Sequence, residues 1–233
     1  WKFTMEYTDY IFLSTTGLFK GIQPQEIQQI LPCLQAQEKD YIKAQAVYRI
    51  GDNVSSMGIV LNGSVVIENN DLWGHTSLID KIEKGQIFGE TYAYLPTEPL
   101  TVTITAEEKT RILFLKTPVI SEVCSNSCSF HNKLIKNLLE LLAQKNLNLT
   151  KRISHTSPRS IRGKLLSYLS FQAKAKGSRD FMIPFSRQQL ADYLNVDRSA
   201  LSAEISKMQK EHILTSQKNR FILYGTENDS VDV

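Results

Sequence analysis

The sequence predicts an α+β protein with an antiparallel β-domain, a long helix, and a C-terminal module of two short helices and a hairpin. Three observations lead to this prediction. Short strand-like runs fill residues 41 to 116, the apolar period changes from two to about 3.6 after Pro118, and basic residues gather near the C-terminus. The 233 residues, 42% of them hydrophobic, suffice for two buried cores. The expected segments are 14–118, 119–155 and 156–226.

The first segment combines short helices with strands. Residues 14–35 are expected to form one or two short helices, with Pro24 early in a helix, where its missing N–H costs nothing. From 41 to 116, apolar or alternating runs such as "MGIVLNGSVVIENND" and "TVTITAEEKTRILFL" are broken by Gly, Asn and Asp. Short, evenly spaced strands rich in Val, Ile and Thr favour a sandwich or small barrel over alternating strands and helices.

A stripe of mostly apolar residues marks the long helix, at steps of 4, 3, 4, 3 and 4. Its members are Ile135, Leu139, Leu142, Asn146, Leu149 and Ile153. A heptad seam of this kind either lines a core or pairs with a second copy, and a lone Asn in it can fix the register of a dimer. We expect a homodimer, with core packing as the alternative. The polar segment "SHTSPRS" that follows is expected to be a hinge.

Charge is distributed unevenly along the chain, whose formal net charge is +3. Residues 1–153 carry 15 basic and 16 acidic residues, residues 154–224 carry 12 and 5, and the tail carries 0 and 3. The module at 154–224 therefore has a net charge of +7. Such asymmetry is typical of a surface that meets nucleic acid, although a solvated basic face gives the same counts.

The stretch from Ser186 to Leu214, "SRQQLADYLNVDRSALSAEISKMQKEHIL", has the pattern of a helix-turn-helix. Ser186 and Asp197 can cap the two helices, and Asn195 suits a tight turn with positive φ. The expected buried positions are Leu190, Ala191, Leu194, Leu201, Ile205, Met208 and Ile213.

In such a motif the second helix enters the major groove, and its early outward residues reach the bases. These residues are Arg198, Ser199, Ser202 and Ala203. Arg198 can bind guanine bidentately, while Lys218 and Arg220 of the following hairpin can contact phosphates. The candidate DNA contacts are Ser186, Arg187, Gln188, Arg198, Ser199, Ser202, Ala203, Lys207, Lys218 and Arg220. The alternative is a helical hairpin that only packs within the protein or that mediates protein contacts.

From Gly17 to Tyr224, the chain resembles the Crp/Fnr family of bacterial transcription regulators. "GLFKGI", "GIVLNGSVVI", "KGQIFGE", the long helix and "SRQQLADYLNVDRSALSAEISKM" occur in the family's order and spacing. The resemblance implies a β-roll of the cyclic-nucleotide-binding type, a dimerisation helix and a winged helix-turn-helix. It further implies a homodimer that binds a palindromic double-stranded DNA operator, with RNA polymerase as a further partner of an activator.

The resemblance also implies an effector site in the β-roll. Gly89 and Glu90 match the family's Gly-Glu pair, but Leu100 and Thr101 stand where cyclic-nucleotide-binding members have Arg and Ser. A leucine offers no charge or donor to a phosphate, so cyclic AMP is not the expected effector. The resemblance still implies a pocket for an unidentified small molecule, because the β-roll closed by the long helix leaves a cavity that other family members use. Its candidate residues are Gly89, Glu90, Tyr92, Tyr94, Leu100, Thr101, Asn146 and Asn148, and core filling is the alternative.

Metal or redox chemistry has weaker support in the sequence. The oxygen-sensing relatives need four cysteines for an iron-sulfur cluster, and this chain has three. Cys124, Cys128 and His131 share one face of a predicted helix and, with Cys33, could bind a soft metal, but packing roles are the simpler interpretation. We therefore expect no metal, and reduced thiols.

The remaining function classes are constrained by what the sequence lacks. The four histidines show no spacing to a nucleophile and a carboxylate, and no phosphate-binding Gly-rich loop occurs, so we do not expect an enzyme. No stretch approaches the roughly 18 apolar residues of a membrane span, and no signal pattern opens the chain, so we expect a cytoplasmic protein without a membrane partner.

Overall fold

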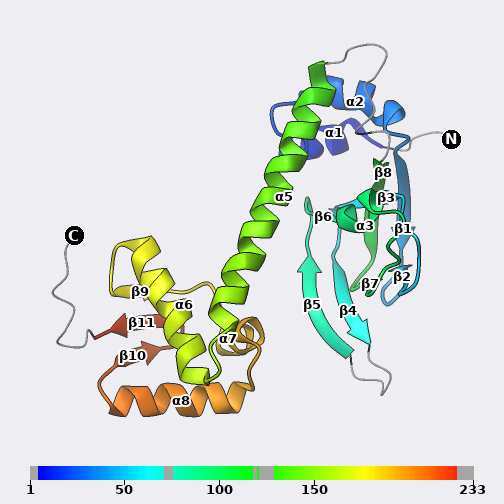
Figure 1. The fold of residues 1–233 in the computed structure, drawn as a ribbon. Helices are drawn as coiled ribbons and strands as arrows, with labels where there is room; N and C mark the ends of the chain where they lie inside the picture. Colours follow the sequence, from blue (N-terminus) through cyan, green and yellow to red (C-terminus); the bar gives the residue numbers. More distant parts are fainter. Residues whose placement is uncertain (1–4, 71–75, 118–119, 121–128, 225–233) are drawn as a thin grey trace. The chain divides into compact units, whose positions relative to one another are not determined.

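The computed structural model describes residues 5–70, 76–117, 120 and 129–224 (Figure 1). It divides into two compact units, Trp1–Ala143 and Gln144–Val233. The division falls within the long helix α5 (Ser129–Thr156), which contributes to both units.

Three helices of the first unit precede or interrupt its strands. They are α1 (Tyr7–Ser14), α2 (Pro24–Cys33) and α3 (Glu90–Tyr94). Pro24 occupies the first turn of α2, as predicted, and reciprocal bonds between Gln23 and Glu26 cap that helix. α1 lies almost entirely before residues 14–35, where the sequence predicts short helices, so most of this helix was not predicted.

The strands of the first unit form two antiparallel four-stranded sheets among the described residues. Their bounds are β1 (Gln37–Tyr41), β2 (Ala46–Tyr48), β3 (Ser56–Asn62), β4 (Val65–Asn70), β5 (Thr76–Ile82), β6 (Ile87–Phe88), β7 (Thr103–Ala106) and β8 (Thr110–Lys116). One sheet has the order β1-β8-β3-β6 and the other β2-β7-β4-β5. The predicted antiparallel architecture without alternating helices is therefore confirmed.

β8 at the centre of its sheet is buried on both faces. Leu113 and Leu115 belong to a core beneath α1 and α2, whereas Ile112 and Phe114 belong to a second core shared with the other sheet. Successive side chains of a strand point to opposite faces, so a strand covered on both sides must be apolar throughout. This explains the uninterrupted "ILFL" run of β8.

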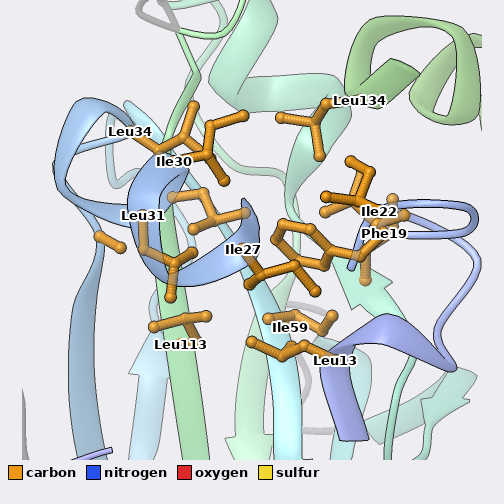
Figure 2. Close-up of a cluster of buried hydrophobic side chains, with 14 of the residues drawn as sticks. Leu13, Phe19, Ile22, Ile27, Ile30, Leu31, Leu34, Ile59, Leu113 and Leu134 are labelled. Atoms are coloured by element: carbon orange, nitrogen blue, oxygen red, sulfur yellow. The ribbon is translucent and has the colours of Figure 1, made fainter. Parts of the chain in front are cut away.

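Figure 2 shows the first of these cores. Leu13 of α1, Ile27, Ile30 and Leu31 of α2, and Leu134 of α5 converge on side chains of β3 and β8. Asn137 of α5 anchors this contact, because its side-chain amide donates to the carbonyls of Leu18 and Lys20 at 2.9 and 2.8 Å. The N-terminal half of α5 is thereby part of the first unit.

The second unit contains the rest of α5 and a small α+β module. Its other elements are α6 (Ile161–Lys176), β9 (Asp180–Met182), α7 (Arg187–Leu194), α8 (Arg198–Lys210), β10 (Leu214–Gln217) and β11 (Arg220–Leu223). The strands form an antiparallel sheet of order β10-β11-β9. In the part of the chain that the structure describes, no helix has the length and apolar character needed to cross a bilayer.

Candidate nucleic-acid interface

Local capping interactions shape the two helices of the predicted motif. The Ser186 hydroxyl accepts from the Gln189 amide, and the Gln189 side chain accepts from the Ser186 amide at 2.8 Å. α7 then ends at Asn195, whose φ is +51°, and the Asp197 carboxylate accepts from the Ala200 amide at 2.8 Å at the start of α8. The predicted caps and the left-handed turn are confirmed.

Each helix of the motif has one buried face. The core of the second unit includes Leu190, Ala191, Leu194, Leu201, Ile205 and Met208, as the sequence predicted, and Ile213 packs partly buried against it. This packing turns the opposite face of α8 to solvent. On that face Arg198, Ser199, Ala203 and Lys207 are exposed, and Ser202 is half-buried.

The orientation of α8 is fixed by an arginine of α6. Arg162 Nε lies 2.6 Å from Glu204 Oε1, and its Nη1 lies 2.7 Å from Glu211 Oε2. The hydrogen bond from Arg162 lowers the pKa of Glu211 below its usual range. Glu204 lies within α8 and Glu211 is its C-cap residue, so a single guanidinium holds this helix at two points.

The hairpin of β10 and β11 contributes further basic residues. Lys218 occupies its two-residue turn, is exposed and has a φ of +54°. Arg220 is exposed too, but its Nε donates to Asp180 of β9 at 2.7 Å, and this bond lowers the pKa of the Asp180 carboxyl. Lys218 is thus presented at the tip, whereas Arg220 already holds β11 to β9.

Three predicted contact residues lie at the start of α7. Arg187 is half-buried: its guanidinium donates to the Ser216 hydroxyl at 2.9 Å and lies 5.5 Å from the centre of the Phe221 ring. Burial lowers the pKa of Arg187 from its ordinary value. Gln188 is exposed and donates to the Asp192 carboxylate at 2.8 Å, and Ser186 is exposed at the cap. Arg187 thus joins α7 to the hairpin.

The heptad seam of α5 differs between its two halves. In the first unit Ile135 and Leu142 are partly buried against the core, and Leu139 is 61% exposed. In the second unit Asn146 is exposed, and Leu149 and Ile153 are 61% and 64% exposed. The seam residues in the C-terminal half of α5 are therefore exposed in the single chain.

The predicted effector residues of the β-domain lie close together. Gly89, with φ +74°, precedes α3, whose first residue Glu90 is buried. Leu100 is 2% exposed and clusters with Val54 and Ala93.

The two polar candidates beside this cluster bind each other. The hydroxyls of Tyr92 and Thr101 are 2.7 Å apart, and Tyr94 packs partly buried against the main core. Asn146 and Asn148 belong to the second unit, where both are exposed and Asn148 accepts from Gln144 at 3.0 Å.

A cavity of about 470 Å³ lies elsewhere in the first unit, between α1 and the ends of β1, β3 and β8. Phe12 and Leu61 provide apolar walls, and Lys84, Lys109 and Arg111 provide basic ones. Arg111 pairs with Asp9 and, at 3.3 Å, with Glu38. None of the predicted effector residues lines this cavity.

The metal candidates are only partly within the described residues. Cys33 is an exposed free thiol, His131 is buried, and Cys124 and Cys128 lie outside the described part. Over residues 5–70, 76–117, 120 and 129–224, no three His, Cys, Asp or Glu side chains converge as a metal site would require.

Sequence reasoning missed the residues that join α5 and α6 to the helix-turn-helix. Arg152, His155 and Lys164 all contact the C-terminal end of α7. Their only sequence signal is that they are basic or titratable residues near the predicted hinge, which does not identify partners 30 to 40 residues away.

Models of two protein families match the chain. A cyclic nucleotide-binding domain matches residues 38–127, and a Crp-like helix-turn-helix domain matches residues 163–224. The joint presence of a cyclic-nucleotide-binding-like domain and this helix-turn-helix defines a class of transcription regulators.

The chain is also similar to individual proteins and solved structures. The cAMP-activated global transcriptional regulator CRP of Haemophilus influenzae is 21% identical over 196 residues, which cover 79% of this chain and 83% of that protein. The structure of CprK complexed with OCPA is 18% identical, covers 85% of this chain and 92% of its own, and superposes with a TM-score of 0.61. The c-di-GMP responsive global regulator CLP of Xanthomonas campestris, also 18% identical, covers 86% and 98% with a TM-score of 0.55. The chain belongs to the Crp/Fnr family.

Proposed function

We propose that this protein is a homodimeric, sequence-specific DNA-binding transcription regulator that acts on a palindromic operator and has no catalytic role. The observation that carries the proposal is the exposed N-terminal face of α8, held by the Asp197 cap and by Arg162. The second helix of such a motif enters the major groove with its early residues toward the bases.

The roles of the contact residues follow from their exposure and partners. Arg198 and Ser199 are exposed on the first turn of α8, where Arg198 can bind O6 and N7 of a guanine. Lys207 and Lys218 are exposed cations suited to phosphates. Arg187 and Arg220 have partners within the protein, so they support the hairpin and contact DNA only where their remaining donors reach it.

The exposed seam supports a homodimer. Leu149 and Ile153 are exposed apolar residues four positions apart in the heptad seam of α5. A second copy of α5 would cover such a row by coiled-coil packing. Two copies related by a twofold axis would present two α8 helices to two half-sites, about 34 Å apart when these lie one turn of DNA from each other. A palindromic operator matches that symmetry.

We propose that the N-terminal domain senses an effector other than a cyclic nucleotide. Leu100 is buried against Val54 and Ala93, and the neighbouring Thr101 hydroxyl bonds to Tyr92. These positions offer a phosphate no positive charge. The charge-assisted hydrogen bond that makes an arginine effective on a phosphate therefore has no counterpart here.

Selection from a randomised DNA pool tests the proposal, with fluorescence anisotropy on the enriched sequence with and without cyclic AMP. We expect a palindromic site, an affinity that falls steeply with salt, and no effect of cyclic AMP. Enrichment of an asymmetric site would overturn the symmetric dimer. No salt-dependent binding would favour a module whose C-terminal domain binds a protein.

A further inference from the structure

The C-terminal end of α7 is held by cations from two other helices of the second unit. Arg152 of α5 donates to the carbonyls of Tyr193 and Asp192 at 3.3 and 3.4 Å. Lys164 of α6 lies 3.3 Å from the carbonyls of Leu194 and Asn195. The last carbonyls of a helix lack partners within it, and cations there are favoured by the helix dipole. The turn of the helix-turn-helix is therefore fixed from outside the motif.

Tyr193 is contacted by α5 in two further ways. The Arg152 guanidinium lies 5.8 Å from the centre of its ring, and its hydroxyl lies 2.9 Å from Nδ1 of His155. His155 is only 4% exposed, and the rings of Tyr168 and Phe171 of α6 stand 5.5 and 5.3 Å from its own. The last two turns of α5 therefore dock on α7 through a buried histidine in an aromatic site.

We infer that Arg152 and His155 are positioning residues, which fix the helix-turn-helix to the end of α5, and that protonation of His155 loosens this junction and weakens specific DNA binding. The DNA-binding part rests on the proposed function. In the proposed dimer, α5 carries the twofold seam, so the contact between α5 and α7 sets the separation of the two α8 helices. Affinity for a palindrome depends on that separation.

The surroundings of His155 favour its neutral form. The charged residues about one turn before it on α5 are Lys151, whose Nζ lies 5.3 Å from the Phe171 ring centre, and Arg152, whose guanidinium lies 5.8 Å from the Tyr193 ring centre. α6 contributes Tyr168, and α7 contributes Tyr193. Burial raises the pKa of both tyrosines, so their hydroxyls stay neutral at physiological pH.

These surroundings set the direction of the pH dependence. Burial, and then the charge of Lys151, lower the pKa of His155 below its ordinary value of 6.5. A histidine with a lowered pKa binds fewer protons in the docked state than in the undocked state. The junction is therefore fully stabilised above about pH 6.5 and loses stability as the pH falls below that value.

The experiment compares the full-length protein with His155→Phe and Tyr193→Phe from pH 7.5 to 5.5 at constant ionic strength. Anisotropy measures affinity for the enriched site and for random DNA. Hydrogen exchange measures protection of the Asn195 and Val196 amides, which bond to carbonyls of α7. His212→Gln is the matched control, because His212 is an exposed histidine of the same unit.

For the wild type and His212→Gln we expect specific affinity and amide protection to fall progressively as the pH is lowered from 7.5 to 5.5, because protonation of His155 favours the undocked state. His155→Phe keeps the ring packing and should show little pH dependence. Tyr193→Phe should lower protection at pH 7.5. The same pH dependence in His155→Phe as in the wild type, or none in the wild type, overturns the inference.

The positioning role of Arg152 is tested at pH 7.5 by hydrogen exchange at the same Asn195 and Val196 amides. Arg152→Ala should lower protection about tenfold and Arg152→Lys should restore part of it, whereas Lys174→Ala removes an exposed cation of α6 and should change nothing. Equal protection in Arg152→Ala and the wild type refutes the positioning role. If the wild type binds no DNA sequence specifically, the proposed function fails, and amide protection still decides the junction.

Discussion

Truncating Leu149 and Ile153 to Ala tests the C-terminal half of the proposed dimer seam. Each change removes three carbon atoms, worth about 0.8 kcal/mol each when fully buried. The two side chains are 61% and 64% exposed in the single chain, so a partner could bury about three fifths of each. The loss is then about 1.5 kcal/mol per side chain. Over the four side chains of a dimer it reaches about 6 kcal/mol, a roughly 10⁴-fold rise in the dimer dissociation constant.

Analytical ultracentrifugation over a dilution series measures this constant directly. Leu147→Ala is the matched control, because Leu147 lies on the same helix and is 47% exposed but falls outside the heptad steps. It should leave dimerisation nearly unchanged. If the double variant dissociates no more readily than the wild type, or if Leu147→Ala weakens the dimer equally, α5 does not pair through this seam.

Three other changes probe recognition, packing and capping. Arg198→Ala should reduce the binding free energy for the enriched DNA site by about 1 to 3 kcal/mol and relax one base preference, whereas Lys218→Ala should weaken binding to all sequences alike. Equal losses on specific and random DNA for Arg198→Ala would contradict base reading. Gly58→Ala places a Cβ 2.3 Å from Cζ of the buried Phe88 ring, so chemical denaturation should show a free energy of unfolding lowered by about 1 to 3 kcal/mol. An unchanged denaturation midpoint would refute the close packing. Hydrogen bonds from Ser199 and the Ala200 amide lower the pKa of Asp197, so the Asp197 cap stabilises the protein above about pH 3.8 and this stability is lost as the pH falls through the folded-state pKa. Asp197→Asn should therefore lose less thermal stability than the wild type between pH 5 and 3. Equal losses would count against the cap.

The helix-turn-helix could be predicted in detail because its determinants are local. Ser186, Asn195 and Asp197 act within three or four residues of their own positions, through a cap, a left-handed turn and a second cap. Short-range chemistry of this kind is fully present in the sequence. The same holds for the strands, because their apolar periods and turn residues predict an antiparallel β-domain without reference to the long-range pairing.

Short elements that depend on distant packing could not be predicted. α3 has five residues, too few for a helical period to show, and it exists because Glu90 and Ala93 are buried against other parts of the unit. The exposure of individual seam residues could not be predicted from the sequence either. Leu142 and Leu149 stand one heptad apart in the sequence, yet the core partly covers the first and leaves the second exposed.

The basic residues of the second unit show most clearly where sequence reasoning stops. A net charge of +7 over residues 154–224 suggested one polyanion-binding surface. Arg162 instead binds two carboxylates of α8, Lys164 caps α7, Arg187 binds Ser216, and Arg220 pairs with Asp180.

These internal contacts show that the basic residues of the second unit have two different roles. One set of cations holds α7, α8 and the hairpin in a fixed arrangement, and another set, with Arg198 and Lys218 among it, is exposed on α8 and at the hairpin tip. Guanidinium and ammonium groups suit both tasks, since carbonyls, carboxylates and phosphates are all oxygen acceptors. Which task a given residue performs is decided by the tertiary neighbours within its reach, and for this reason the charge count located the module but not its contact surface.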